Sequence, residues 1–529
     1  MQFFIACLPI LSVFVFLILL RLPAIKAMPI SLAIALACVG IFWKMPSNAI
    51  YASMIEGIVL AGTILIILFG AMLVLNTLKH VGALKSIEIK FNHLTQDQRI
   101  QTLIVTYGFG SLMEGIAGFG TPAALCAGLL LALGFKPIQA VVLALVADCA
   151  AVSFGAVGTP LLLGVGSSLE QFDTMQLNQL ASSILMIEFM TGILTSLSLM
   201  ALIIFVFGKQ SITAKLAWNQ MFSMVPLCII ANTTFIGVAY LSIQVFNTVE
   251  FSSIFGALAM LLVLFVLSYK KWLTPKTVFR LTEFEEKDQT LPLSLTRAAT
   301  PYALIILLLL ISRLEVLPFK RWLIDFKFSL VHIFDTSISV SVSPLYLPGF
   351  FFALALFLSL PALKLSIRQY SIEASNTIKQ LTLTSITLIC AIVLVRLFLN
   401  SSINLNQSAS MPIVIANSMT SWFPDTWVFF SPFIGALGSF ISGSATFSNM
   451  MFSQLQFAGA EQLSLDPNKM MILQVIGANA GNMICVVNVV AAASVVGCQG
   501  QEGQIIKLTI IPMMIYCLSA ASFVLLFFL

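Results

Sequence analysis

Apolar stretches of about 20 residues recur along almost the whole chain, and a run of that length is what a helix needs to cross a bilayer. Hydrophobic residues make up 59% of the 529 residues and charged residues 9%, against roughly 25% charged in an ordinary soluble domain. We therefore expect an all-α polytopic membrane protein with about 12 transmembrane helices. The first apolar run, 3–20, lacks a positively charged start and a small-residue cleavage site, which favours a retained span over a signal peptide.

Basic residues in the short loops predict how the chain is oriented, because cytoplasmic loops are enriched in Lys and Arg. Arg21 and Lys26 follow the first span, and four basic residues lie in 79–100, so both loops are expected inside. The segment 401–424 has no Lys or Arg and is expected outside. This count puts both termini on the periplasmic side. It also puts 313–345 outside, although that segment carries Arg313, Lys320, Arg321 and Lys327.

Charge and motif content exclude several functional classes. The net charge of +5 is small and no basic tract is present, so no nucleic-acid partner is expected. Nine cysteines lie almost entirely in apolar stretches without a C-x-x-C pair, and only three histidines accompany them, so we expect neither a metal site nor a cofactor. The absence of a Walker loop, a G-x-S-x-G elbow and an H-E-x-x-H motif argues against an enzyme and against an ATP-driven pump.

One glycine-rich stretch interrupts an apolar region and contains a carboxylate. It runs from Tyr107 to Pro122 and reads YGFGSLMEGIAGFGTP, with Glu114 among five glycines. Glycine at this density weakens a helix, and Thr-Pro suits the first turn of a new one. We expect a re-entrant hairpin here, followed by a second interruption at 153–160 (SFGAVGTP), just after Asp148. An interrupted backbone in a membrane needs protein or a water-filled cavity around it, so such breaks indicate a binding site.

A similar arrangement returns near the C-terminus. The stretch GSFISGSATFSNMMF, 438–452, resembles 110–122, and a further interruption follows at 477–488 (GANAGNMICVVN). By the count of sides, the two hairpins enter from opposite faces of the membrane. Units at about 99–164 and 425–497 would then be inverted repeats, a plan of secondary transporters. Glycine-rich helices also serve close packing, but their paired occurrence favours a site.

Two acidic residues beside the breaks are candidates for proton coupling, Glu114 first and Asp148 second, because an acidic group at membrane depth is costly to keep. The alternative for each is a carboxyl that stays neutral or caps a helix N-terminus. Glu56 and Glu188 also lie within spans but have no break beside them in the sequence, and they rank lower.

Binding of an anion requires donors and partial positive charge, which helix N-termini provide. The expected N-termini lie at Thr121, Thr159 and 444–449. Four asparagines could hydrogen-bond a carboxylate or a hydroxyl group, or could instead satisfy the interrupted backbone: Asn449, Asn479, Asn482 and Asn488. Arg396 lies near the outer end of its span, so we expect its side chain to extend to the membrane surface.

Five segments give the chain a family resemblance: MEGIAGFGTP, LGFKP, DCAAVSFGAVGTP, SPFIGALGSFISGSATFSNMMF and GNMICVVNVVAAASVVG. Together they resemble the L-lactate permease family of bacterial membrane transporters, in order and over most of the chain. The resemblance implies proton-coupled import of lactate across the inner membrane, with glycolate and related 2-hydroxymonocarboxylates as alternative substrates. It also implies a role for the matching residues Glu114, Gly115, Gly118, Gly120, Pro122, Gly443, Ser444, Ser448 and Asn449.

The chain departs from the family pattern at three positions in the second unit. Ala445 stands where a polar residue is expected, Asn482 where some members have lysine, and Val487 in a run that is more polar elsewhere. These departures leave the exact substrate and the coupling stoichiometry open.

Two other functions are compatible with the sequence. A sodium-coupled or exchange carrier for another small organic anion would use unwound carbonyls, for instance near Gly155 and Gly481. A membrane-embedded enzyme or a channel belongs to a different class; the enzyme would need a nucleophile or metal cluster, and the channel would not concentrate its substrate. The expected partners are a small organic anion, a proton or sodium ion, and the lipid bilayer, while the sequence predicts no oligomeric state.

Overall fold

The computed structural model of the chain describes residues 2–20, 22–118, 120–166, 168–169, 172–208, 213–281, 293–313, 318–422 and 424–527. Within these residues, eight helices are long and apolar enough to cross a membrane, and a ninth candidate is a pair of helices, 137–148 and 152–165, bent by 63°. Several shorter apolar helices accompany them. The protein is an all-α polytopic membrane protein. Helix length alone does not fix the number of crossings, so about 12 spans stays a prediction.

The N-terminal helices form one edge of the molecule, and they are α1 (Gln2–Phe14), α2 (Ala24–Ala37), α3 (Ser47–His80) and α4 (Ala83–Leu94). Helix α3 packs along α17 (Ile367–Leu399). A Cβ atom at Gly57 would lie 2.7 Å from the Cα atom of Val393, so the two backbones approach as closely as glycine permits. This close packing makes α3 and α17 a rigid support beside the glycine-rich units.

The first glycine-rich unit consists of short helices separated by breaks: α5 (Gln98–Thr102), a π-helical segment (Leu103–Phe109), α6 (Gly110–Ile116), α7 (Thr121–Ala132), α8 (Pro137–Asp148), a 3-10 turn (Val152–Phe154), α9 (Gly155–Thr159) and a second π-helical segment (Pro160–Val165). Proline occupies the first turn of α7 and of α8, where its missing N–H costs nothing. The chain therefore leaves the helical conformation between Ile116 and Thr121, and again after Asp148.

The second unit repeats this order of elements with longer helices: α19 (Trp427–Ser442), α20 (Ala445–Gln462), α21 (Pro467–Asn482) and α22 (Val486–Val496), followed by α23 (Glu502–Phe527). Its breaks lie between Ser442 and Ala445 and between Asn482 and Val486. Pro467 begins α21 as Pro137 begins α8. Residues 470–496, which make up most of α21 and all of α22, are buried inside the protein.

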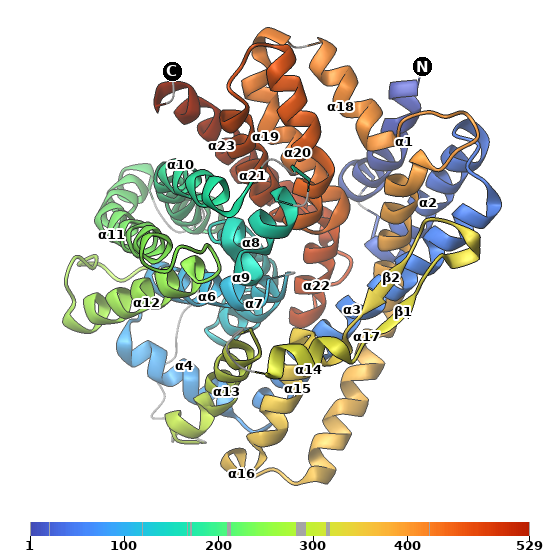
Figure 1. Cartoon of the computed structure of the whole chain (residues 1–529). Helices are drawn as coiled ribbons and strands as arrows, with labels where there is room; N and C mark the ends of the chain where they lie inside the picture. Colours follow the sequence, from blue (N-terminus) through green and yellow to red (C-terminus); the bar gives the residue numbers. More distant parts are fainter. Residues whose placement is uncertain are drawn as a thin grey trace.

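The remaining elements are α10 (Thr174–Ala201), α11 (Ala214–Phe246), α12 (Ser252–Lys270), α13 (Leu295–Arg313), α14 (Phe319–Asp325), β1 (Phe328–Leu330), β2 (Val340–Val342), α15 (Pro348–Leu358), α16 (Leu360–Leu363) and α18 (Met411–Trp422). Figure 1 shows α6 to α9 at the centre, between α10 to α12 on the left and α19 to α22. The two interrupted units thus form the interior, and continuous helices surround them.

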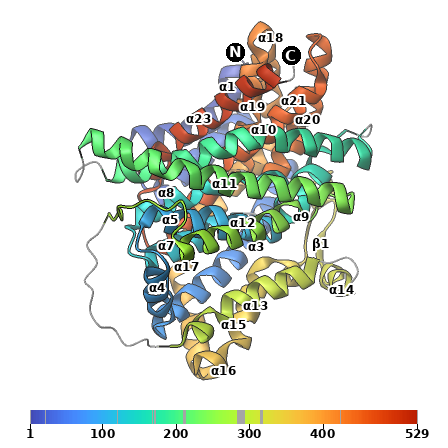
Figure 2. The same cartoon turned by 90° about the vertical axis from the view of Figure 1, so that its left-hand side faces the viewer.

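The loops gather in two groups that agree with the sides predicted from charge. Among the loops expected inside, the backbone N–H of Phe279 donates to Asp97 (3.1 Å) and that of Leu293 donates to Ser86 (3.1 Å). Among those expected outside, Asn48 donates to the carbonyl oxygen of Phe334 (3.3 Å). Helices α10, α11 and α12 run across the view in Figure 2, with α4 and α5 toward their left end and β1 and α14 toward their right.

The short antiparallel hairpin of β1 and β2 was not expected from the sequence. It falls in the segment 313–345, whose placement outside rested on the weakest charge pattern. Ile333, Ile338 and Val340 pack against Ala52 near the start of α3. The hairpin therefore groups with the other loops that the charge count puts outside, in spite of its basic residues.

Candidate functional site

The first break ends in a helix N-terminus without a side-chain cap. Gly118 and Gly120 have positive φ angles of 60° and 73°, a conformation that favours glycine. Gly120 is the N-cap residue of α7 and makes no side-chain hydrogen bond, while the Thr121 hydroxyl donates to the Gly118 carbonyl oxygen (2.8 Å). The first N–H groups of α7 therefore face the break without a capping acceptor from the N-cap side chain.

The second broken helix restarts directly beside this point. Helix α22 packs against α7, and a Cβ atom at Gly120 would overlap the side-chain amide of Asn488, in the first turn of α22. The N-cap residue of α22, Cys485, also provides no side-chain cap. The Nδ2 of Asn488 is buried without a hydrogen-bond partner among the described residues. Two uncapped helix N-termini and one unused amide donor thus meet in the interior.

Glu114 lies in α6 with 3% of its surface exposed. Its carboxyl group rests against the backbone of Gly155, where a Cβ atom would overlap Oε1. Its other oxygen, Oε2, has no hydrogen-bond partner among the described residues. The leading candidate for proton coupling is therefore a buried carboxyl group at the junction of both breaks of the first unit.

Asp148, the last residue of α8, is equally buried, with 3% exposed. Neither of its carboxyl oxygens has a hydrogen-bond partner in the part of the chain that the structure describes. It lies close enough to Glu114 for the two groups to interact electrostatically. Two carboxyl groups this close cannot both be charged without mutual repulsion, so the structure brings both predicted acidic residues into one site.

Glu188, which the sequence ranked below Glu114 and Asp148, bonds to residues of both interrupted units. It lies in α10, and its Oε1 accepts hydrogen bonds from the hydroxyl of Ser153 (2.6 Å) and from Nδ2 of Asn479 (3.0 Å). The Asn479 amide also donates to the Ser153 hydroxyl (2.7 Å). Ser153 belongs to the first unit and Asn479 to the second. Glu188 therefore lies next to a helix break in the folded protein, although no break is near it in the sequence. The signal available in the sequence was a single glutamate, Glu188, within an otherwise uncharged helix.

The second unit's first break is capped and tightly bonded. Gly443 has a φ angle of 74°, and the Ser444 hydroxyl accepts a hydrogen bond from the N–H of Phe447 (3.5 Å). Ser448 donates to the Gly435 carbonyl oxygen (2.7 Å), and Asn449 donates to that of Pro160 (3.0 Å). Ser448 thus bonds to a carbonyl inside α19, and Asn449 bonds to the backbone at the start of the segment Pro160–Val165, which follows a break of the first unit.

The two units also touch at the other predicted residues. The hydroxyl oxygens of Thr159 and Thr446 are 3.4 Å apart. Asn482, at the end of α21, is 5% exposed, and its Oδ1 has no partner among the described residues. One departure from the family pattern makes an apolar contact, because Ala445 packs with Val152 and Ala478.

Arg396 does not extend to the membrane surface as expected. Its side chain is only 13% exposed, its Nη1 lies 3.4 Å from Oε1 of Glu56, and its Cζ lies 4.9 Å from the ring centre of Phe447. Arg396 instead contacts two nearby partners. Glu56 on α3 provides a counter-charge, and the ring of Phe447 on α20 provides a π-face. The ion pair was missed because its partners are 340 residues apart by numbering, from Glu56 to Arg396.

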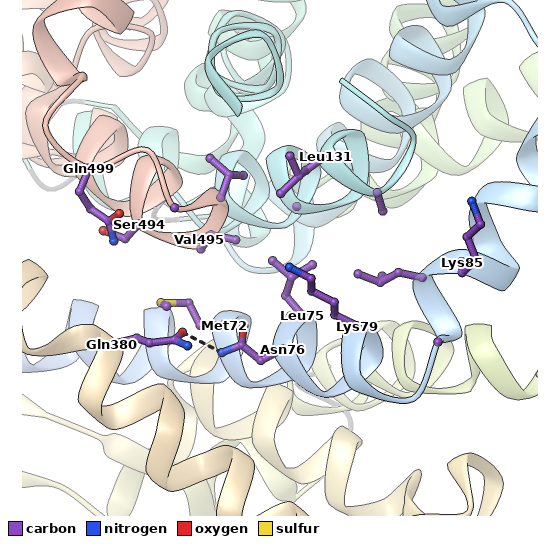
Figure 3. Close-up of a pocket in the computed structure, with 16 residues that line it drawn as sticks. Met72, Leu75, Asn76, Lys79, Lys85, Leu131, Gln380, Ser494, Val495 and Gln499 are labelled. Carbon is purple, nitrogen blue, oxygen red and sulfur yellow. Dashed lines mark hydrogen bonds between the residues drawn. The ribbon is translucent and has the colours of Figure 1, made fainter. Parts of the chain in front are cut away.

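A cavity of about 670 Å³ lies at the far ends of the two half-helices that start at the breaks. Its lining includes Leu131 of α7, Ser494 of α22, and Lys79 and Lys85 from α3 and α4. Figure 3 shows Lys79 between α3 and α7, and the hydrogen bond from Asn76 to Gln380 (3.0 Å) at one edge. Since both α7 and α22 run from a break to this cavity, they point in the same direction. No group of three or more potential metal ligands occurs among the described residues.

Comparison with known proteins identifies the family. The family model described as L-lactate permease matches residues 2–529. The L-lactate permease of Escherichia coli K12 is 30% identical over 540 residues, which cover 96% of this chain and 92% of that protein. A putative L-lactate permease of Haemophilus influenzae is 29% identical (94% and 93% covered), and the glycolate permease GlcA of Escherichia coli K12 is 26% identical (96% and 92% covered). The chain is thus a membrane transporter and not an enzyme, and it belongs to the L-lactate permease family.

Proposed function

We propose that this permease imports L-lactate, or a related 2-hydroxymonocarboxylate such as glycolate, by symport with a proton across a bacterial inner membrane. The names of its relatives support the substrate class, because proteins similar over nearly their full length are named for lactate and for glycolate. The coupling ion rests on the site itself, as follows.

The meeting of α7 and α22 is the observation that carries the proposal. Each helix N-terminus bears roughly half a positive charge and free N–H donors, which suits an anionic group. The carboxylate of the substrate would lie between these two ends and accept a hydrogen bond from Nδ2 of Asn488, which has no other partner among the described residues. The hydroxyl of a 2-hydroxy acid would donate to Oδ1 of Asn482, which also has none.

Glu114 would carry the proton. A buried carboxylate with no cation beside it is costly, so uptake of a proton is the natural way to neutralise it before it moves through the membrane. One substrate anion and one proton together add no net charge to the moving site. Asp148 would share this role, because it interacts electrostatically with Glu114.

The test is uptake of radiolabelled L-lactate into proteoliposomes with an inward proton gradient, for the wild type and for Glu114→Gln. Gln keeps the shape of the side chain but cannot bind the proton. We expect the wild type to accumulate lactate only while the gradient lasts, and accumulation by the variant to fall to the level of the collapsed gradient. The exposed Glu461, at the end of α20, gives a control, and Glu461→Gln should behave as the wild type.

Other outcomes would change specific parts of the proposal. Accumulation that follows a sodium gradient and ignores pH would replace the proton by sodium. Uptake of glycolate but not of lactate would change the substrate and keep the mechanism. Transport of neither compound under either gradient would contradict the proposed substrate class.

A further inference from the structure

Arg396 on α17 brings a positive charge to the first break of the second unit. Its guanidinium lies over the ring of Phe447, and Phe447 is in the first turn of α20, bonded through its N–H to the capping hydroxyl of Ser444. Ala445 and Asn482, which lie at the two breaks of this unit, carry no charge. Arg396 therefore brings a cation to this unit from a neighbouring helix.

The hydrogen-bonding capacity of Arg396 is largely unused. A guanidinium group has five N–H donors arranged as a fork that matches a carboxylate. Its approach to Glu56 is 3.4 Å, longer than the 2.7–2.9 Å of a strong charged hydrogen bond. Its Nε is buried without a hydrogen-bond partner among the described residues. The ion pair balances the charge of Arg396 but leaves its Nε donor unused.

Glu56 is held more firmly than Arg396. Its Oε2 accepts a hydrogen bond from Nδ2 of Asn400 (2.7 Å), and the same amide donates to the hydroxyl of Ser53 (3.1 Å). If Arg396 changed its partner, Glu56 would keep these contacts. The pair therefore has one anchored member and one member that can move.

We propose that Arg396 binds the carboxylate of the transported substrate from the α20 side of the start of α22, where a Cβ atom at Gly443 would lie 3.4 Å from Val487, and that Glu56 holds Arg396 while the site is empty. The proposal rests on the proposed function, since it requires an anionic substrate. A carboxylate taken from water into the protein loses its hydration, which only a well-oriented cation or several donors can offset. Arg396 provides two parallel donors for this purpose, and the ring of Phe447 keeps the guanidinium plane directed toward the break.

A purely structural ion pair is the competing explanation, and a double variant separates the two. Removing one member of a buried pair leaves an unpaired charge, whereas removing both restores neutrality. If the pair only stabilises the fold, Glu56→Gln combined with Arg396→Gln should restore normal transport. If Arg396 binds the substrate, the double variant should stay as defective as Arg396→Gln alone.

The experiment is initial-rate uptake of L-lactate and of glycolate by the full chain in proteoliposomes, with thermal unfolding in detergent as a check on folding. Relative to the wild type, Arg396→Gln should raise KM at least tenfold, and the double variant should match it. Glu56→Gln should leave KM unchanged or lower, because the competing carboxylate is gone. Arg368→Gln, an exposed arginine on the same helix, is the matched control and should change nothing.

Arg396→Lys keeps a charge next to Glu56 but loses the two-pronged geometry, so it should fold normally and still raise KM at least threefold. The proposal is overturned if the double variant regains the KM of the wild type, or if Arg396→Gln and Arg396→Lys both have the wild-type KM. A wild type that transports neither acid overturns the proposed function together with this inference, whereas normal wild-type uptake with unaffected Arg396 variants overturns this inference alone.

Discussion

Gly155 allows the backbone of the first unit to pass directly over the carboxyl group of Glu114. A Cβ atom at this position would overlap Oε1 of that group. We predict that Gly155→Ala lowers lactate uptake at least tenfold, because a buried carboxyl in a close-packed region has no room to retreat. Initial uptake rates in proteoliposomes, normalised to the amount of folded protein, would measure the effect.

Gly237 in α11 provides the matched control for this substitution. No atom lies within 4 Å of the Cβ position of Gly237, and alanine is more favourable than glycine inside a helix by about 1 kcal/mol. Gly237→Ala should therefore transport as the wild type does and unfold at an equal or higher temperature. Wild-type uptake by Gly155→Ala would show that Glu114 is not constrained by this contact and would weaken its assigned role.

For single residues, the sequence predicted those features that depend on neighbouring positions in the chain. The glycines around Glu114 and the Thr-Pro pair at 121–122 are close in sequence, so their spacing predicts the break that the structure contains. The bond between Glu188 and Asn479 and the pair of Arg396 with Glu56 join residues hundreds of positions apart. Such contacts depend on how helices pack, and no local pattern encodes them.

The half-helices of the two units associate in two mixed pairs. Helix α7 of the first unit packs against α22 of the second, and the segment 160–165 of the first packs against α20 of the second. Helices α7 and α20 are the second arms of the two hairpins, whereas α22 and the segment 160–165 are the second halves of the two broken helices. Each pair therefore joins a hairpin arm of one unit to a half-helix of the other. We propose on this basis that 99–164 and 425–497 are inverted repeats, since exchange of the two units maps one pair onto the other.

The contact between Thr159 and Thr446 offers a way to test movement of these pairs. Their hydroxyl oxygens are 3.4 Å apart, so cysteines at both positions are close enough for a disulfide. Alternating access requires the surroundings of the site to open on one side at a time. We predict that Thr159→Cys combined with Thr446→Cys loses roughly 90% or more of its uptake on oxidation, because the disulfide would prevent the two pairs from separating. Reduction should restore uptake.

The single cysteine variants control for reaction with the nine native cysteines, seven of which are buried. Mass spectrometry of peptides would verify the new disulfide. A fully cross-linked protein that transports at the wild-type rate would mean that the two units do not separate at this contact during transport.

Among the elements, the long apolar helices were predictable, whereas the hairpin of β1 and β2 was not. Each strand has only three residues, too few for an alternating pattern to be recognised. Its loop residues Ile333 and Ile338 pack on α3, so tertiary packing and not local preference accounts for it.

The whole molecule has two faces, which lie toward opposite ends of α10 to α12 (Figure 2). One face contains the cavity of about 670 Å³ with Lys79 and Lys85 in its lining, at the ends of α7 and α22 away from the breaks. The other contains the hairpin of β1 and β2, toward the opposite end of α10 to α12 (Figure 2). If the positive-inside rule holds for this chain, the cavity is the cytoplasmic exit for the anion and both chain termini face the periplasm.

Labelling with a membrane-impermeant maleimide tests this orientation. Leu405 is 74% exposed beside Lys44, to whose carbonyl oxygen its N–H donates, and Gln499 is exposed in the lining of the cavity. We predict that Leu405→Cys reacts in intact cells, whereas Gln499→Cys reacts only in inside-out vesicles, each measured above the labelling of the wild type. The opposite result would reverse the protein in the membrane and make the lysine-lined cavity an entrance. Labelling of both from one side would contradict the separation of the two faces, because the inner and outer loops would then share a compartment.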